Sequence, residues 1–87
     1  MLPMTNNLFN LRELGQAVRS ERKALGLTQA ELAKRAGLRR ETIIQLEAGV
    51  NISAHTLLQT CTSLGKCLRI DDIRLDYDRL KETFDEV

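Results

Sequence analysis

The chain has 87 residues, enough for one domain with a small core. It is 43 % hydrophobic but only 3 % aromatic, which favours helices packed through aliphatic side chains over a β-sandwich. The sequence contains neither an 18-residue apolar run nor a leader-like segment, so we expect no membrane partner, no secretion signal and a cytoplasmic location.

The net charge of +1 conceals an uneven distribution. Residues 9–69 carry ten basic and five acidic side chains, whereas residues 70–87 carry three basic and seven acidic ones. This asymmetry suggests an anionic partner for the basic body and a different role for the acidic end. An unevenly charged, solvated surface would produce the same composition.

The N-terminal third predicts a flexible arm followed by a helix. Residues 1–8 contain the only proline and show no apolar period, which indicates a frayed arm. From Leu11 to about Leu25, apolar residues recur with the spacing of one helical face, and Gly26 suits the C-terminal cap. The apolar residues of this face are Leu11, Leu14, Ala17, Val18 and Leu25.

The next segment, 27–37, reads LTQAELAKRAG and predicts a short helix. Thr28 and Glu31 have the spacing of a capping box at its start, and Gly37 stops it. A helix this short is marginal in water, so it must lean on a neighbour. Its alanines, Ala30, Ala33 and Ala36, are small enough to let another helix approach closely.

After the glycine turn, residues 38–49 predict a third helix that ends at Gly49. Ile43 and Leu46 mark its buried stripe. The spacing leaves the opposite face outward, with the i, i+4 pairs 40/44 and 41/45. Two short helices joined by a glycine turn, the second presenting polar side chains, form a helix-turn-helix pattern.

The remaining elements are a fourth helix, a strand and an acidic tail. Ser53 is a good N-cap for a helix that runs until Gly65. Residues 66–70, KCLRI, alternate as a short strand that pairs either with the tail or with its copy in a second subunit. We favour a helix over about 76–84, although Ile73, Leu75 and Tyr77 also alternate like a strand.

The sequence offers little that suggests catalysis. Cys61 and Cys67 stand six residues apart without a second pair, so we expect two small core residues and neither a disulfide framework nor a metal site. A phosphate-binding glycine loop and a nucleophile with its base are also missing from the sequence. We therefore predict no enzymatic activity and no cofactor.

The segment GLTQAELAKRAGLRRETIIQLEAG, residues 26–49, resembles the DNA-binding domain of the lambda-type Cro/repressor (XRE) helix-turn-helix regulators. The resemblance covers about residues 11–65 and implies an all-α, lambda-repressor-like bundle of four to five helices with a short C-terminal strand. More weakly, residues 57–72 are similar to the Hip-type antitoxins, in which the trailing strand builds a dimer sheet. The implied division is an arm at 1–8, a DNA-binding domain at 9–65, and a strand plus acidic segment at 66–87.

The resemblance also assigns roles to side chains. Phosphate contacts fall to Thr28, Gln29, Arg39 and Thr42, base contacts to Arg40, Glu41, Ile44 and Gln45, an ion pair between helices to Arg22 and Glu47, and a dimer strand to Cys67, Leu68, Arg69 and Ile70. The base-reading chemistry is reasonable, since arginine pairs with guanine, glutamine with adenine, glutamate with cytosine and isoleucine with a thymine methyl.

Several of these roles have plainer alternatives. Gln29 is also simply a good helix former, Glu41 is equally suited to a salt bridge on the helix surface, and an exposed Ile44 also suits a protein contact. The resemblance as a whole predicts a homodimeric repressor that binds double-stranded operator DNA. It is further expected to be the antitoxin of an autoregulated toxin–antitoxin operon with a kinase-like toxin as partner. The alternative is a free-standing phage-type or stress-response repressor.

Overall fold

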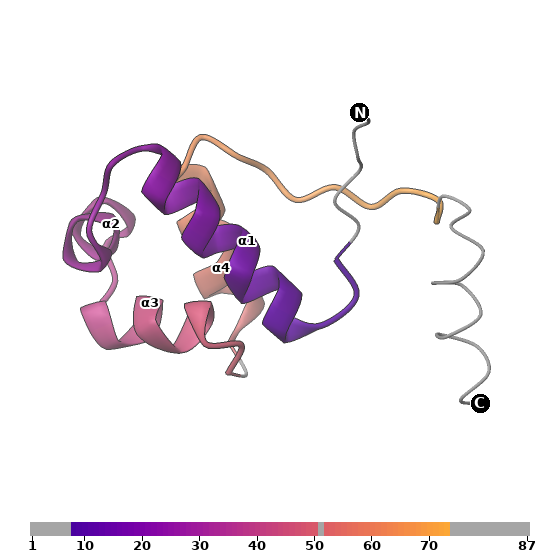
Figure 1. Ribbon diagram of the computed structural model, residues 1–87, viewed down its shortest axis with the longest axis horizontal. Helices are drawn as coiled ribbons and strands as arrows, with labels where there is room; N and C mark the ends of the chain where they lie inside the picture. The colour runs from indigo at the N-terminus through magenta and orange to yellow at the C-terminus, as the bar shows by residue number, and fades with distance from the viewer. Residues whose placement is uncertain (1–7, 51, 74–87) are drawn as a thin grey trace.

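The computed structural model describes residues 8–50 and 52–73, and these form a bundle of short helices (Figure 1). The helices are α1 (Leu11–Ala24), α2 (Gln29–Ala36), α3 (Arg40–Glu47) and α4 (Ala54–Ser63). Helix α1 packs against α3, α3 against α2, and α2 against α4. The all-helical bundle is confirmed, and none of its helices is long and apolar enough to cross a membrane.

The helix ends form where the local sequence satisfies free backbone groups. Asn10 caps α1, and Ser53 caps α4 by accepting the N–H of Thr56. The capping box of α2 is present, with the Thr28 hydroxyl accepting from the Glu31 N–H at 3.0 Å. Gly37 ends α2 in the left-handed region at φ +70°, which glycine adopts without steric cost. The predicted turn chemistry is therefore confirmed at both ends of α2.

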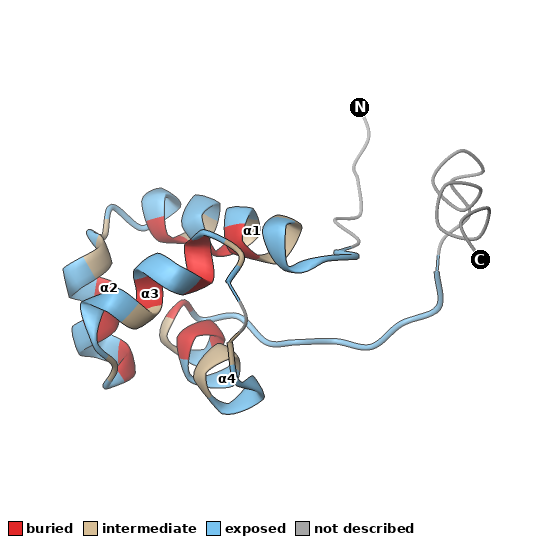
Figure 2. Cartoon of the chain, turned by 90° about the horizontal axis from the view of Figure 1, so that it is seen from below, coloured by how far each residue is buried: buried red, intermediate tan, exposed pale blue. Residues whose placement is uncertain are grey.

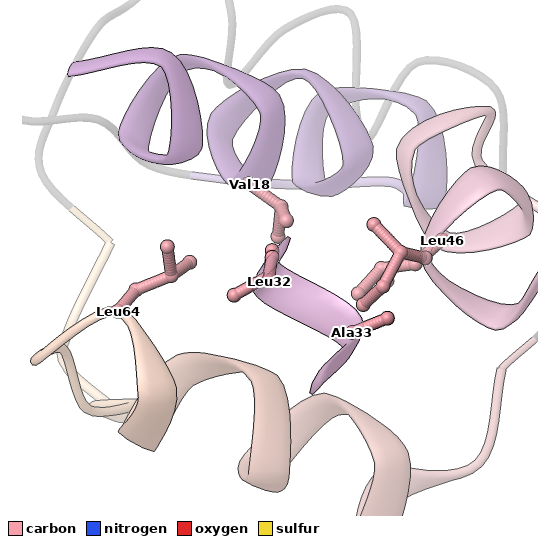
Figure 3. Close-up of a cluster of buried hydrophobic side chains, with 6 residues drawn as sticks. Val18, Leu32, Ala33, Leu46 and Leu64 are labelled. Carbon is pink, nitrogen blue, oxygen red and sulfur yellow. The ribbon is translucent and has the colours of Figure 1, made fainter. Parts of the chain in front are cut away.

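One small core holds the four helices together (Figure 3). Its buried residues come from α1, α2, α3 and the C-cap of α4: Val18, Leu32, Ala33, Ile43, Leu46 and Leu64. The buried faces of the helices turn toward one another while their outer faces are exposed (Figure 2). Burial in this shared core is what stabilises α2 and α3, because eight residues are too few for a helix to persist alone.

The crossing of α1 and α3 depends on a glycine. A Cβ on Gly15 would lie 2.5 Å from the carbonyl oxygen of Leu46 and 2.6 Å from that of Glu47. Only a residue without a side chain allows the two backbones to approach this closely. This contact brings the end of α3 against the middle of α1.

The burial of α1 differs from its predicted apolar face. Val18 is buried, but Leu11, the first residue of α1, and Leu25, its C-cap, are 41 % and 51 % exposed. Gly15 and Arg22 lie on the buried face instead. Ala30 of α2 is likewise exposed, whereas Ala33 and Ala36 are buried as predicted.

The predicted strand at 67–70 is not confirmed. Residues 66–73 form neither helix nor strand and extend away from the bundle (Figure 1). A single extended segment needs a second strand to complete its hydrogen bonds, and the described residues of one chain contain none. Cys67 is therefore exposed, so its predicted place in the core is wrong, while Cys61 is buried as expected. The proposed helix at 76–84 and most of the arm at 1–8 lie outside the described residues.

Candidate nucleic-acid interface

Helix α3 presents a polar face to solvent because its apolar stripe is held in the core. Ile43 and Leu46 are 0 % and 1 % exposed. On the opposite face, all four predicted base-reading residues are exposed, namely Arg40, Glu41, Ile44 and Gln45. Exposure of this face to solvent leaves it able to enter the major groove of a duplex, which is wide enough to admit a helix.

The turn between α2 and α3 places two arginines at the start of the exposed face. Leu38 donates its N–H to the Ala33 carbonyl at 2.9 Å, which closes the turn after Gly37. Arg39 is the N-cap of α3 and makes no side-chain cap hydrogen bond. Ion pairs among residues 8–50 and 52–73 use neither Arg39 nor Arg40, so both guanidinium groups are available to an anion.

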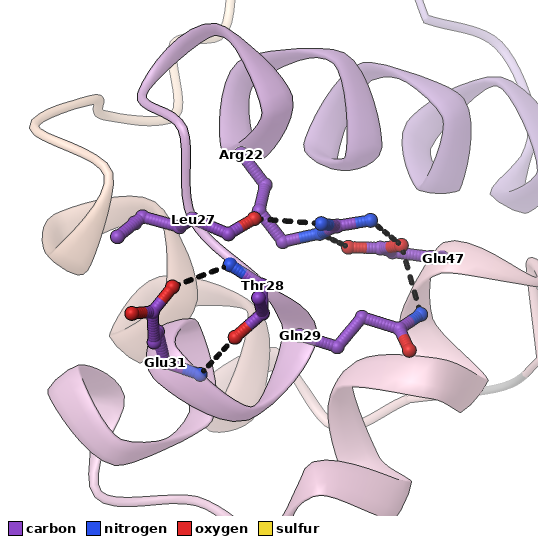
Figure 4. Close-up of polar contacts among 6 residues, drawn as sticks. All are labelled: Arg22, Leu27, Thr28, Gln29, Glu31 and Glu47. Atoms are coloured by element: carbon purple, nitrogen blue, oxygen red, sulfur yellow. Dashed lines mark hydrogen bonds and ion pairs between the residues drawn. The ribbon is translucent and has the colours of Figure 1, made fainter.

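Arg22 and Glu47 form a buried ion pair between α1 and α3 (Figure 4). The Nε of Arg22 donates to Oε2 of Glu47 at 2.6 Å and its Nη2 donates to Oε1 at 3.0 Å. Its Nη1 donates to the Leu27 carbonyl at 2.8 Å, so the same guanidinium also holds the loop before α2. Hydrogen bonding to Glu47 raises the pKa of Arg22. The pair predicted from the resemblance is thus present, and it links three segments.

Gln29, the first residue of α2, joins this ion pair. Its Nε2 donates to Oε1 of Glu47 at 3.2 Å (Figure 4). The contact crosses 18 positions in the sequence and was not predicted. The spacing of Arg22 and Glu47 in the family pattern gives no sign of it, because it depends on how α2 lies against α3.

The N-terminus of α2 opens onto a shallow hollow of about 500 Å³. The hollow is lined by Arg22, Thr28, Gln29, Ala30 and Arg40. The first backbone N–H groups of a helix have no partner within the helix, and together with the helix dipole they favour anions. Arg40, which is in no ion pair among the described residues, adds positive charge beside them, whereas the charge of Arg22 is offset by Glu47. This arrangement suits one phosphate group.

The remaining predicted site residues are two threonines and the four residues of the segment at 67–70. Thr28 is exposed and its hydroxyl oxygen already accepts from Glu31, while Thr42 is half-buried early in α3. Cys67, Leu68, Arg69 and Ile70 are all exposed on the segment that leaves the bundle. Among the described residues there is no group of three His, Cys, Asp or Glu side chains that could hold a metal ion.

The sequence is similar to known transcriptional regulators. A helix-turn-helix family model matches residues 18–67. An uncharacterized HTH-type transcriptional regulator of Methanothermobacter thermautotrophicus is 62 % identical over 32 residues, which make up 37 % of this chain. The matched part spans only 46 % of the length of that relative.

Solved structures share the fold. A HipB variant in a complex with an O2 20mer superposes with a TM-score of 0.75 and 28 % identity, over 82 % of this chain and 100 % of that one. A chain of a HipA-HipB-O2-O3 complex gives 0.74 and 27 %, over 80 % of this chain and 100 % of that one. The clp gene regulator ClgR from C. glutamicum gives 0.61 and 34 %, over 76 % of this chain and 85 % of that one.

Proposed function

Because the chain belongs to the XRE-type helix-turn-helix family of transcriptional regulators, we propose that it is a sequence-specific repressor that binds operator DNA as a homodimer. The observation that supports this proposal best is the exposed outer face of α3, held in place by the buried Ile43 and Leu46. This face begins at the hollow at the N-terminus of α2, where a phosphate would be bound.

In this proposal the side chains divide into two groups. Arg40, Glu41, Ile44 and Gln45 read base edges in the major groove. Thr28, Gln29, Arg39 and Thr42 bind the backbone phosphates on either side and fix the register of α3 in the groove. The Arg22–Glu47 pair touches no base and keeps the two helices in their relative positions.

The proposed dimer would place two α3 helices in successive major grooves about 34 Å apart. The exposed segment at 67–70 supports a dimer, because its backbone has no strand partner within the described chain. Pairing with the same segment of a second copy would complete its hydrogen bonds across a two-fold axis.

We further propose that the repressor is the antitoxin of an autoregulated toxin–antitoxin operon, with a kinase-like toxin bound through the acidic 70–87 segment. This is supported by the similarity to HipB chains, one of which comes from a complex that also contains HipA. The similarity to a clp gene regulator favours the alternative of a free-standing repressor without a toxin.

Base reading is tested by comparing Arg40→Ala with Lys34→Ala. On a duplex selected from a random pool by the wild-type protein, Arg40→Ala is expected to weaken binding by roughly 1 to 3 kcal/mol and to relax preference at one base pair. Lys34 is exposed on α2, outside the proposed reading face, so Lys34→Ala should at most lower affinity evenly across sequences. Equal loss for Arg40→Ala on selected and random duplexes would contradict base reading.

The antitoxin role is tested by deleting residues 76–87. The shortened protein should bind the selected duplex as tightly as the full chain, because the deletion removes no residue of α1–α4. It should no longer co-purify with the product of the neighbouring gene. Retained co-purification would refute the assignment of the tail as the partner-binding surface.

A further inference from the structure

We propose that Glu47 is a positioning residue for the phosphate contact of Gln29, an inference that rests on the proposed DNA-binding function. The Glu47 side chain is only 3 % exposed and so has little surface through which to touch DNA. Its Oε1 nevertheless accepts the Nε2 group of Gln29 at 3.2 Å, at the edge of the hollow where a phosphate would lie. Glu47 therefore acts through Gln29.

The carboxylate determines which end of the Gln29 amide faces the ion pair. An ionised carboxylate accepts hydrogen bonds and donates none, so the amide nitrogen must turn toward it. Nε2 has two hydrogens, and the contact with Glu47 uses one of them. The second remains available to an anion. With the amide reversed, its oxygen would face the carboxylate and repel it.

Arg22 makes this arrangement compatible with an anionic ligand. A carboxylate beside a phosphate would normally be unfavourable, but two hydrogen bonds from the Arg22 guanidinium offset the charge of Glu47. The Gln29 side chain is also held in the DNA-free protein, so less rotamer freedom is lost on binding. The ion pair thus does more than join α1 to α3.

The test is a mutant cycle in two matched backgrounds that both lack the ion pair. The apolar background combines Arg22→Met with Glu47→Leu, which removes the acceptor. The amide background combines Arg22→Met with Glu47→Gln, which keeps a neutral carbonyl acceptor for Gln29. Apolar replacement of a buried ion pair is often tolerated, and circular dichroism melts verify that each background is folded. Gln29→Ala is then added to the wild type and to both backgrounds.

Binding is measured by fluorescence anisotropy on a random-sequence duplex of about 20 base pairs, because a phosphate contact does not depend on base sequence. Gln29→Ala should weaken binding about tenfold in the wild type, as expected for a hydrogen bond to a charged group. The effect should be smaller in the amide background, because the introduced amide can present either its oxygen or its nitrogen to Gln29. In the apolar background its effect should fall below about twofold. A purely structural role for Glu47 predicts the same tenfold effect in all three, and that result would overturn the inference.

A second measurement uses the unmodified protein and needs no folded variant. By NMR, one Nε2 proton of Gln29 should exchange slowly with solvent in the free protein, and the other should shift when the duplex is added. Equal exchange of the two protons in the free protein would refute the positioning role. Failure of the wild type to bind any duplex at low salt would instead refute the proposed function, which separates the two outcomes.

Discussion

Replacing Gly15 by alanine tests whether the close crossing of α1 and α3 is required. In an exposed helix interior, Gly→Ala stabilises by about 1 kcal/mol through helix propensity. Here the added Cβ would lie 2.5 Å, 2.6 Å and 2.8 Å from backbone atoms of Leu46 and Glu47. Ordinary van der Waals contact begins at 3.4 Å, so the helices would have to separate by about 0.9 Å.

The size and sign of the effect follow from these contacts. The clashing atoms belong to the backbone and cannot rotate away, which places the overpacking cost near the upper end of the usual range, at about 3 kcal/mol. The separation would also stretch the ion pair between Arg22 and Glu47, which spans the same two helices. After about 1 kcal/mol of propensity gain, we expect a net destabilisation of about 2 kcal/mol.

Thermal unfolding followed by circular dichroism measures this effect. A loss of about 2 kcal/mol corresponds to a fall in Tm of about 8–16 °C for a domain of this size. Gln16→Ala is the matched control, because Gln16 is the next residue on α1 and is exposed. Its Tm should change little. An unchanged or raised Tm for Gly15→Ala would refute the reasoning from the α1–α3 contact.

Three further predictions concern stability and reactivity. Hydrogen bonding to Thr28 lowers the pKa of Glu31. The stabilising contribution of Glu31 should therefore be present above the carboxyl's unfolded-state pKa and disappear as pH falls through the folded-state value. Thermal melts of Glu31→Gln should lack this pH-dependent component of stability. Iodoacetamide should alkylate exposed Cys67 well before Cys61, whose thiol pKa is raised by burial, and equal labelling rates by mass spectrometry would contradict this. Leu46→Ala should cost about 2–5 kcal/mol in urea unfolding, whereas exposed Ile44→Ala should cost far less.

Much of the fold was predictable because its signals are local. The capping box at Thr28 and the glycine that ends α2 were both identified from residues a few positions apart. The exposed face of α3 was also predicted. Because Ile43 and Leu46 form the apolar stripe that packs inward, the opposite side of the helix must face outward. By contrast, the predicted burial of Leu11 and Leu25 was wrong, because periodicity identifies an apolar face but not which of its residues the rest of the chain covers.

The candidate site shows the same division. Its four outward side chains on α3 follow from the helical period. The bond between Gln29 and Glu47 does not, because it joins the start of one helix to the end of another. The position of Cys67 was also mispredicted, since the alternation of residues 66–70 indicates an extended segment but does not supply the strand it would pair with.

The order of residues alone determined, to within about two residues, where each helix starts and stops, and it determined which of its faces is apolar, because capping and periodicity act over one or two turns. Only packing in three dimensions decided that α1 approaches α3 closely enough to require Gly15. It also decided that Arg22 and Gln29 both reach the carboxylate of Glu47. The physical reason is that such contacts depend on the angle and distance between helices, which are set by the shared core and not by any one segment.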